Sequence, residues 1–196
     1  RAAGGGDTRR LRAEIRDDHP RGGDDLGAVE AGDELAGGAD HLAALPYVDK
    51  DRMGAMGWSW GGYAMMWLEG HTTRFKALAA MMGVYDLRSM HGATEELWFS
   101  EWENGGTPFD NPQGYQKFNP ANHVANFKVP MLVIHGQQDF RIPVEQGIGV
   151  FTALQRQGIE SKFLYFPDEN HWVLKPQNSV QWHDTVNAWL KQHIGQ

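Results

Sequence analysis

One serine stands in a setting that could make it a nucleophile. Residues 57–62 read Gly-Trp-Ser-Trp-Gly-Gly, so Ser59 is the centre of a Gly-x-Ser-x-Gly pattern. An apolar run, Met53 to Gly57, precedes it, and a helix-like segment, Tyr63 to Glu69, follows it. A sharp turn from strand to helix needs glycine on both sides of the serine and lifts the hydroxyl clear of the backbone. The pattern alone is weak evidence, because the chain contains 24 glycines.

The partners that such a serine needs can be found farther along the chain. A serine hydroxyl is a poor nucleophile unless an imidazole takes its proton, and a carboxylate usually orients that imidazole. In an open parallel sheet these groups lie in loops at the carboxyl ends of strands. Asp139 is the only acid in the loop after the predicted strand Met131–His135, and His171 is the only histidine in the loop after Lys162–Phe166. The chain order serine, aspartate, histidine is that of α/β-hydrolases, so we predict a catalytic triad of Ser59, Asp139 and His171.

Other polar residues compete for these roles. His135 ends a strand, and we expect a hydrogen-bonded core histidine there; His183 is expected on the exposed side of the last helix. Asp168 and Glu169 share the loop of His171, and we expect them to cap that loop or to face solvent. Asp86 follows the second strand, where some hydrolases carry their acid, and it remains the alternative to Asp139.

The predicted chemistry is acyl transfer through an acyl-enzyme. One donor to the oxyanion should be the backbone N–H of Trp60, the residue after the nucleophile. The second donor normally comes from a His-Gly-Gly loop after an earlier strand, and this chain has no such motif. One missing donor costs about a hundred- to thousandfold in rate. We therefore expect the chain alone to be an incomplete catalyst.

Apolar runs and helical spacing predict the elements that position these residues. The predicted strands are Arg52–Trp58, Phe75–Met82, Met131–His135 and Lys162–Phe166; the first and third are expected to be buried. The predicted helices are Pro143–Gln157 and Ser179–Ile194. Alternation of strand and helix predicts an α/β fold, a mostly parallel sheet with helices on both faces. Residues 84–128 are expected to be irregular. Near the amino end, Gly37-Gly38 is expected to interrupt any long helix, so a weak helix is expected over Asp24 to Leu35, and its continuation through Ala39 to Leu45 stays open.

Composition excludes several other classes of protein. At 196 residues the chain has room for one domain, and a net charge of −7 argues against binding to nucleic acid. No apolar run approaches the length of a membrane span, so no membrane partner is expected. There is no cysteine, and the histidines lack ligand spacing, so we expect neither a metal nor another cofactor. The compartment stays open between cytoplasmic and periplasmic or secreted, as does assembly into a homo-oligomer.

Three segments resemble the prolyl oligopeptidase family of serine peptidases. Residues 57–63 resemble that family's Gly-Trp-Ser-Tyr-Gly-Gly-Tyr, and residues 135–143 are similar to its His-Gly-x-x-Asp-x-Arg-Val-Pro. Residues 166–174 and 95–99 are most similar to the dipeptidyl-peptidase V and acylaminoacyl-peptidase branch. The resemblance covers about residue 47 to the end, whereas residues 1–46 match poorly.

The resemblance carries further expectations. It implies that residues 1–196 are part of an α/β-hydrolase catalytic domain that lacks its first strands, and that the parent protein also has a β-propeller domain. Substrates would be short peptides, from which dipeptides or acylated residues are released. Trp60, Val84, Tyr85 and Ile142 would lie near the S1 pocket.

Two other functions remain open from the sequence. A carboxylesterase uses the same triad on the same fold, and a non-catalytic hydrolase-fold module would use the fold for assembly. The second alternative predicts broken triad geometry, whereas all three triad residue types are present.

Overall fold

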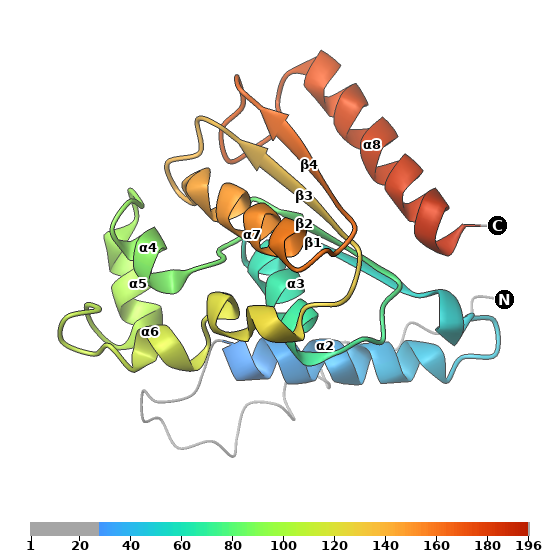
Figure 1. Ribbon diagram of the computed structural model, residues 1–196, viewed down its shortest axis with the longest axis horizontal. Helices are drawn as coiled ribbons and strands as arrows, with labels where there is room; N and C mark the ends of the chain where they lie inside the picture. Colours follow the sequence, from blue (N-terminus) through green and yellow to red (C-terminus); the bar gives the residue numbers. More distant parts are fainter. Residues whose placement is uncertain (1–27, 196) are drawn as a thin grey trace, which may run out of the picture.

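The computed structural model describes residues 28–195, so residues 1–27, and with them the start of the helix expected from Asp24, lie outside the described part. The described residues form one parallel sheet with the strand order β1-β2-β3-β4. Its strands are β1 (Gly54–Trp58), β2 (Ala77–Met81), β3 (Met131–Gly136) and β4 (Ser161–Phe166). The predicted parallel α/β architecture is therefore confirmed (Figure 1).

The register of the strands brings their carboxyl ends together at one end of the sheet. Trp58 is paired with Met81, Met81 with Ile134, and Ile134 with Leu164. The loops after β1, β3 and β4 consequently begin at the same end of the sheet. This is the arrangement in which residues far apart in sequence can meet at the end of an open sheet.

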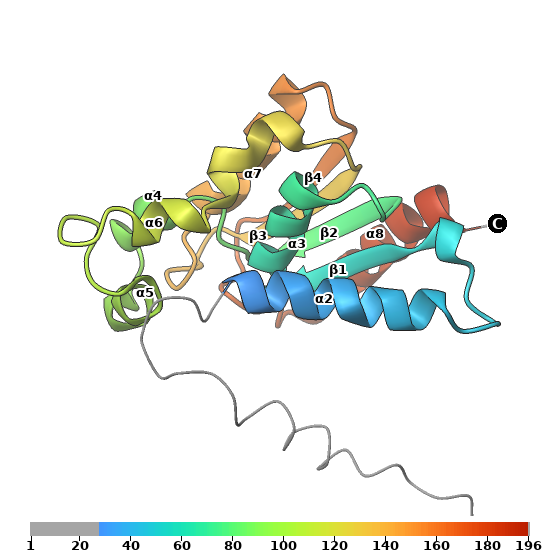
Figure 2. The same ribbon diagram turned by 90° about the horizontal axis from the view of Figure 1, so that it is seen from below.

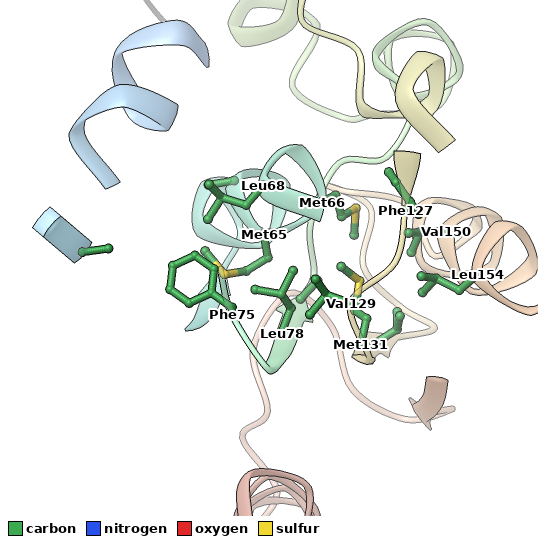
Figure 3. Close-up of a cluster of buried hydrophobic side chains, with 14 residues drawn as sticks. Met65, Met66, Leu68, Phe75, Leu78, Phe127, Val129, Met131, Val150 and Leu154 are labelled. Atoms are coloured by element: carbon green, nitrogen blue, oxygen red, sulfur yellow. The ribbon is translucent and has the colours of Figure 1, made fainter. Parts of the chain in front are cut away.

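Helices cover both faces of the sheet. The helices α3 (Trp60–His71) and α7 (Glu145–Arg156) pack on one face, and α8 (Pro176–Ile194) packs on the other (Figure 1). Side chains alternate between the faces: Leu78 and Val133 point toward α3 and α7, whereas Ala79 and Ile134 point toward α8. Figure 3 shows the first of these two cores, which methionines and branched side chains fill.

The two central strands, β2 and β3, are fully buried, as unbroken apolar runs predict. The prediction of a buried first strand is wrong for β1. It lies at an edge of the described sheet and is only partly buried, with Met56 exposed. The short η1 helix (Lys50–Arg52) leads into this strand.

The helix α2 (Ala28–Ala43) runs without a break through Gly37-Gly38, so the expected interruption is wrong and the helix continues past Ala39, the alternative that the sequence left open. Two glycines in a helix cost about 2 kcal/mol relative to alanine. Tertiary contacts offset this cost: Ala39 is buried in the core, and Arg74 donates to the Ala36 carbonyl oxygen and pairs with Asp40. In Figure 2, α2 lies along α3 and β1.

We predicted that the segment between β2 and β3 is irregular. This prediction is wrong, because the segment carries four short helices. They are α4 (Leu87–His91), α5 (Leu97–Asn104), α6 (Gly114–Lys117) and η2 (Pro120–Asn126), and the first three gather to one side of the sheet (Figure 1). Local capping explains part of this: Asp86 caps α4, and Pro120 occupies the first turn of η2. No helix in residues 28–195 is both long enough and apolar enough to cross a lipid bilayer.

Candidate active site

Ser59 sits in a strained turn between β1 and α3. Its φ of 58° and ψ of −116° are values that a residue with a side chain rarely adopts. The Ser59 backbone N–H donates to the carbonyl oxygen of Met81 at 2.9 Å, which ties the turn to the neighbouring strand. The half-buried serine thus stands where β1 ends and the amino end of α3 begins.

We expected the turn to require glycine on both sides of the serine, at Gly57 and Gly61. The structure requires glycine at Gly57 and at Gly62 instead. A Cβ atom on Gly57 would overlap the carbonyl group of Gly61, and one on Gly62 would meet the backbone of Gly83 at 2.8 Å. A Cβ atom on Gly61 would meet nothing within 4 Å. The expectation is therefore wrong at Gly61, and the close approach of α3 to the end of β2 is what demands glycine at Gly62.

The structure brings the three predicted triad residues together. His171 Nε2 lies 3.0 Å from Ser59 Oγ, and His171 Nδ1 lies 2.7 Å from Asp139 Oδ2. The imidazole and the carboxylate are almost inaccessible to solvent, with His171 6% and Asp139 2% exposed. Residues 112 and 32 positions apart in sequence thereby form one hydrogen-bonded chain.

Backbone groups of its own loop fix the Asp139 carboxylate. Its second oxygen, Oδ1, accepts hydrogen bonds from the N–H groups of Arg141 at 3.1 Å and Ile142 at 2.9 Å. Arg141 in turn forms an ion pair with Glu96, 3.1 Å between Nε and Oε1, in the segment before α5. One carboxylate oxygen thus holds the loop while the other faces His171.

The loop of His171 is held by Glu169, whose structural importance the sequence did not reveal. The buried Glu169 carboxylate accepts hydrogen bonds from the backbone N–H groups of Leu174 and Lys175 and from the Asn178 side chain, at 2.7–3.1 Å. Asp168 instead forms an exposed ion pair with Lys175. The expectation that these two acids cap the loop or face solvent matches their positions, with the capping done by Glu169. Two adjacent acids before the histidine are the only sequence signal for it.

The rival residues have other partners. Asp86 caps α4: its Oδ1 accepts hydrogen bonds from the N–H groups of Arg88 and Ser89. His135 is fully buried, and its Nε2 lies 2.7 Å from the Ile142 carbonyl oxygen, to which it donates. Burial lowers the pKa of His135, because the cation would lose its hydration. His183 is exposed on α8.

The residues predicted near the S1 pocket divide between two clusters. Val84 and Ile142 are buried in one cluster, against which the Trp60 ring packs. Tyr85 packs instead against the core between the sheet and α7, close to Gly149. Trp60 is the first residue of α3, so its backbone N–H has no acceptor within the helix and is available to a ligand.

Within residues 28–195 no group of three or more histidine or acidic side chains is arranged as a metal site. The hydrogen-bonded groups of the site are those of Ser59, His171 and Asp139, and the buried His135 Nε2 also lies 3.6 Å from Asp139 Oδ2. A serine that donates to a neutral imidazole, itself oriented by a carboxylate, can attack a carbonyl carbon.

Known proteins are similar to this chain in sequence and in fold. Dipeptidyl-peptidase 5 of Porphyromonas gingivalis is 43% identical over 161 residues, which cover 79% of this chain and 23% of that protein. Dipeptidyl-peptidase 5 of Schizosaccharomyces pombe is 44% identical over 148 residues, 74% of this chain and 22% of that protein. The solved structure of Pyrococcus horikoshii acylaminoacyl peptidase matches with a TM-score of 0.78 at 26% identity, covering 84% of this chain and 28% of that one.

These similarities confirm the α/β-hydrolase fold. The chain spans less than a quarter of the length of the two dipeptidyl-peptidases. A sequence model of the prolyl oligopeptidase family matches residues 19–196, a range that begins upstream of Tyr47, where the resemblance of the motifs starts. On this match the chain belongs to the prolyl oligopeptidase family.

Proposed function

We propose that this chain carries the catalytic centre of a serine peptidase that releases dipeptides or acylated residues from the amino ends of short peptides. The observation that carries the proposal is the hydrogen-bonded chain Ser59–His171–Asp139, with spacings of 3.0 and 2.7 Å. A module used only for assembly would have no need of that geometry. The names of its relatives, dipeptidyl-peptidase 5 and acylaminoacyl peptidase, support the choice of peptides as substrates.

In the proposed mechanism Ser59 Oγ attacks the scissile carbonyl carbon while His171 Nε2 accepts the hydroxyl proton. Asp139 Oδ2 accepts a hydrogen bond from His171 Nδ1–H, which fixes the tautomer and stabilises the imidazolium. His171 then gives the proton to the leaving amine, and an acyl-enzyme remains on Ser59. A water molecule, deprotonated by the same imidazole, hydrolyses this ester and regenerates the serine.

The proposed oxyanion donor in this chain is the backbone N–H of Trp60. Its position at the start of α3 supports this role, because the helix leaves that N–H unpaired and its dipole favours negative charge there. We propose that the second donor comes from another part of the parent polypeptide. We also propose that this polypeptide contains a β-propeller domain. Activity is accordingly proposed for the complete polypeptide.

We further propose that Trp60, Val84, Tyr85 and Ile142 border the S1 pocket. Packing of Trp60 against the cluster that holds Val84 and Ile142 supports an apolar pocket next to the nucleophile. Tyr85 follows Val84 directly, and its ring would contribute from the side of α7. An apolar pocket would favour substrates with an apolar side chain before the scissile bond.

Hydrolysis assays on the complete polypeptide test the proposal. Chromogenic dipeptidyl, acetyl-aminoacyl and short-chain ester substrates should be compared with the unaltered protein, Ser59→Ala and His171→Ala. We expect turnover of a dipeptidyl or acetyl-aminoacyl substrate, with kcat lower by about four orders of magnitude in each variant. Turnover of esters alone would favour the carboxylesterase alternative. No Ser59-dependent turnover of any substrate by the folded protein would overturn the enzyme assignment.

A further inference from the structure

Trp58, the residue before Ser59, contacts the loop that carries His171. It is the last residue of β1, and its indole N–H donates to the backbone carbonyl oxygen of His171 at 3.1 Å. Its ring also lies beside that of Trp172, with centroids 5.5 Å apart and planes inclined at 34°. Trp58 thus contacts the backbone of His171, 113 positions away in sequence, and the side chain of the residue that follows it.

This contact matters because His171 lies between β4 and α8, outside any helix or strand. Its ring must reach Ser59 Oγ and Asp139 Oδ2 at the same time. Asp139 and Ser59 bind the two ring nitrogens of His171. The hydrogen bond from Trp58 instead holds the backbone of His171. A shift of about 1 Å in such a group can cost a hundredfold in rate.

Trp58 is well suited to hold that backbone. Its ring packs against the core cluster between the sheet and α8, so the donor is fixed by apolar contacts rather than by a flexible stem. Since Trp58 and Ser59 are neighbours in the chain, any movement of the nucleophile is shared with the group that holds His171. The indole N–H has no accessible pKa, so it takes no part in proton transfer.

We propose that Trp58 is a positioning residue, whose N–H bond to the His171 carbonyl oxygen sets the distance between the imidazole and Ser59. The inference rests on the proposed function, because it gives Trp58 a role in the same reaction. Trp58 acts through His171 and does not touch the reacting atoms. Its removal should therefore slow the chemical step without weakening the binding of substrate.

The direct test is Trp58→Phe in the complete polypeptide, which keeps an aromatic ring and removes the donor. Loss of one hydrogen bond of this kind predicts a kcat lower by about three- to tenfold, with KM unchanged. A benzothienyl-alanine analogue at Trp58, which replaces the N–H by sulfur and keeps the shape of the ring, should give the same loss. If Trp58→Phe does not fold, the protein with this analogue is used to test the role of the N–H donor.

The chain offers a matched control in Trp189→Phe. Trp189 also donates its indole N–H to a backbone carbonyl oxygen, that of Leu78 at 3.2 Å, and belongs to the same core cluster. It lies on α8, away from the loop of His171. The two variants lose equivalent bonds, so Trp189→Phe should lower the stability of the fold and leave kcat unchanged.

A second arm separates positioning from a general structural effect. In a His171→Ala background, Trp58→Phe should cause no further loss of the residual rate, because the group that it positions is absent. An equal loss in both backgrounds, or a kcat for Trp58→Phe as high as that of Trp189→Phe, would overturn this inference alone. Absence of any Ser59-dependent turnover in the unaltered protein would overturn the proposed function, and this inference with it.

Discussion

The backbone N–H of Gln138 donates to the carbonyl oxygen of Glu169 at 2.9 Å, which ties the loop of Asp139 to the loop of His171. A second bond, from Gln137 N–H to the Phe166 carbonyl oxygen at 2.8 Å, continues the β3–β4 pairing into these loops. Gly136 lies so close to Asn170 and Glu169 that any Cβ atom there would overlap their backbone. The two loops therefore form one unit, and what stabilises either of them stabilises the spacing between the acid and the histidine.

Glu169→Gln should loosen this unit. One carboxylate oxygen would become an NH₂ group that faces a backbone donor, and loss of a hydrogen bond to a charged group costs about 1.5–3 kcal/mol. Urea titration should show this loss in the free energy of unfolding, together with a lower kcat. The control is Asp168→Asn, which removes the adjacent exposed carboxylate and should leave stability nearly unchanged. Equal stability of both variants would contradict the role given to Glu169.

The same variant predicts a pH dependence. Burial alone would raise the pKa of Glu169, but the bonds from Asn178, Leu174 and Lys175 outweigh it and hold the pKa below the ordinary value of 4.5. A carboxylate with a lowered folded-state pKa stabilises the protein above that ordinary value, and the contribution disappears as the pH falls through the folded-state pKa. The stability difference between the unaltered protein and Glu169→Gln should therefore shrink in acid. A difference that grows in acid would contradict the sign of the shift.

Glu69 should confer a pH dependence of the opposite sign. It is 1% exposed, its Oε1 accepts from the N–H groups of Lys128 and Val129 at 2.6 and 2.7 Å, and burial raises its pKa to about 7. Between pH 4.5 and 7 the folded protein retains a proton that the unfolded chain has released, so stability falls as the pH rises.

Glu69→Gln mimics the protonated acid and should remove this trend. Relative to the variant, the unaltered protein should lose about 3 kcal/mol of unfolding free energy as the pH rises through this window. Urea titrations at several pH values measure this difference, and Glu160→Gln, which removes an exposed carboxylate, is the control. Parallel curves for the unaltered protein and Glu69→Gln would contradict the raised pKa.

Two neighbouring glycines should respond in opposite ways to the same substitution. Gly62→Ala would press its methyl group into the backbone of Gly83, and overpacking of this kind costs about 1–3 kcal/mol. Gly61→Ala has open space around the new methyl group and adds a better helix former, so stability should hold or rise by up to about 1 kcal/mol. Thermal unfolding of both variants provides the comparison. A larger loss in Gly61→Ala than in Gly62→Ala would show that the turn is not packed as described.

The sequence allowed the fold to be predicted because β2 and β3 are unbroken apolar runs of strand length, which are typical of strands buried on both faces of a parallel sheet. The approach of Ser59, Asp139 and His171 could be predicted for a related reason, since each follows a strand that ends at the same edge of the sheet. Their catalytic roles stay a prediction until they are tested in solution.

What could not be predicted depends on contacts between distant residues. Helical propensity places a break at Gly37-Gly38, but the packing of Ala39 and the bonds of Arg74 keep α2 intact. The spacing around Ser59 does not reveal which glycine meets Gly83. Nothing in the sequence links Trp58 to the carbonyl oxygen of His171, because that bond forms only when β1 and the loop after β4 lie side by side.

Covalent labelling of the complete polypeptide with a fluorophosphonate probe, with the modified residue mapped by mass spectrometry, tests the central claim most directly. We predict that the label is found on Ser59, disappears in Ser59→Ala and forms far more slowly in His171→Ala. Ser161 is the first residue of β4, so it lies at the amino ends of the strands, away from the triad. The variant Ser161→Ala should therefore keep full labelling. A folded polypeptide that takes up no label, or one whose labelling survives Ser59→Ala, would contradict the account.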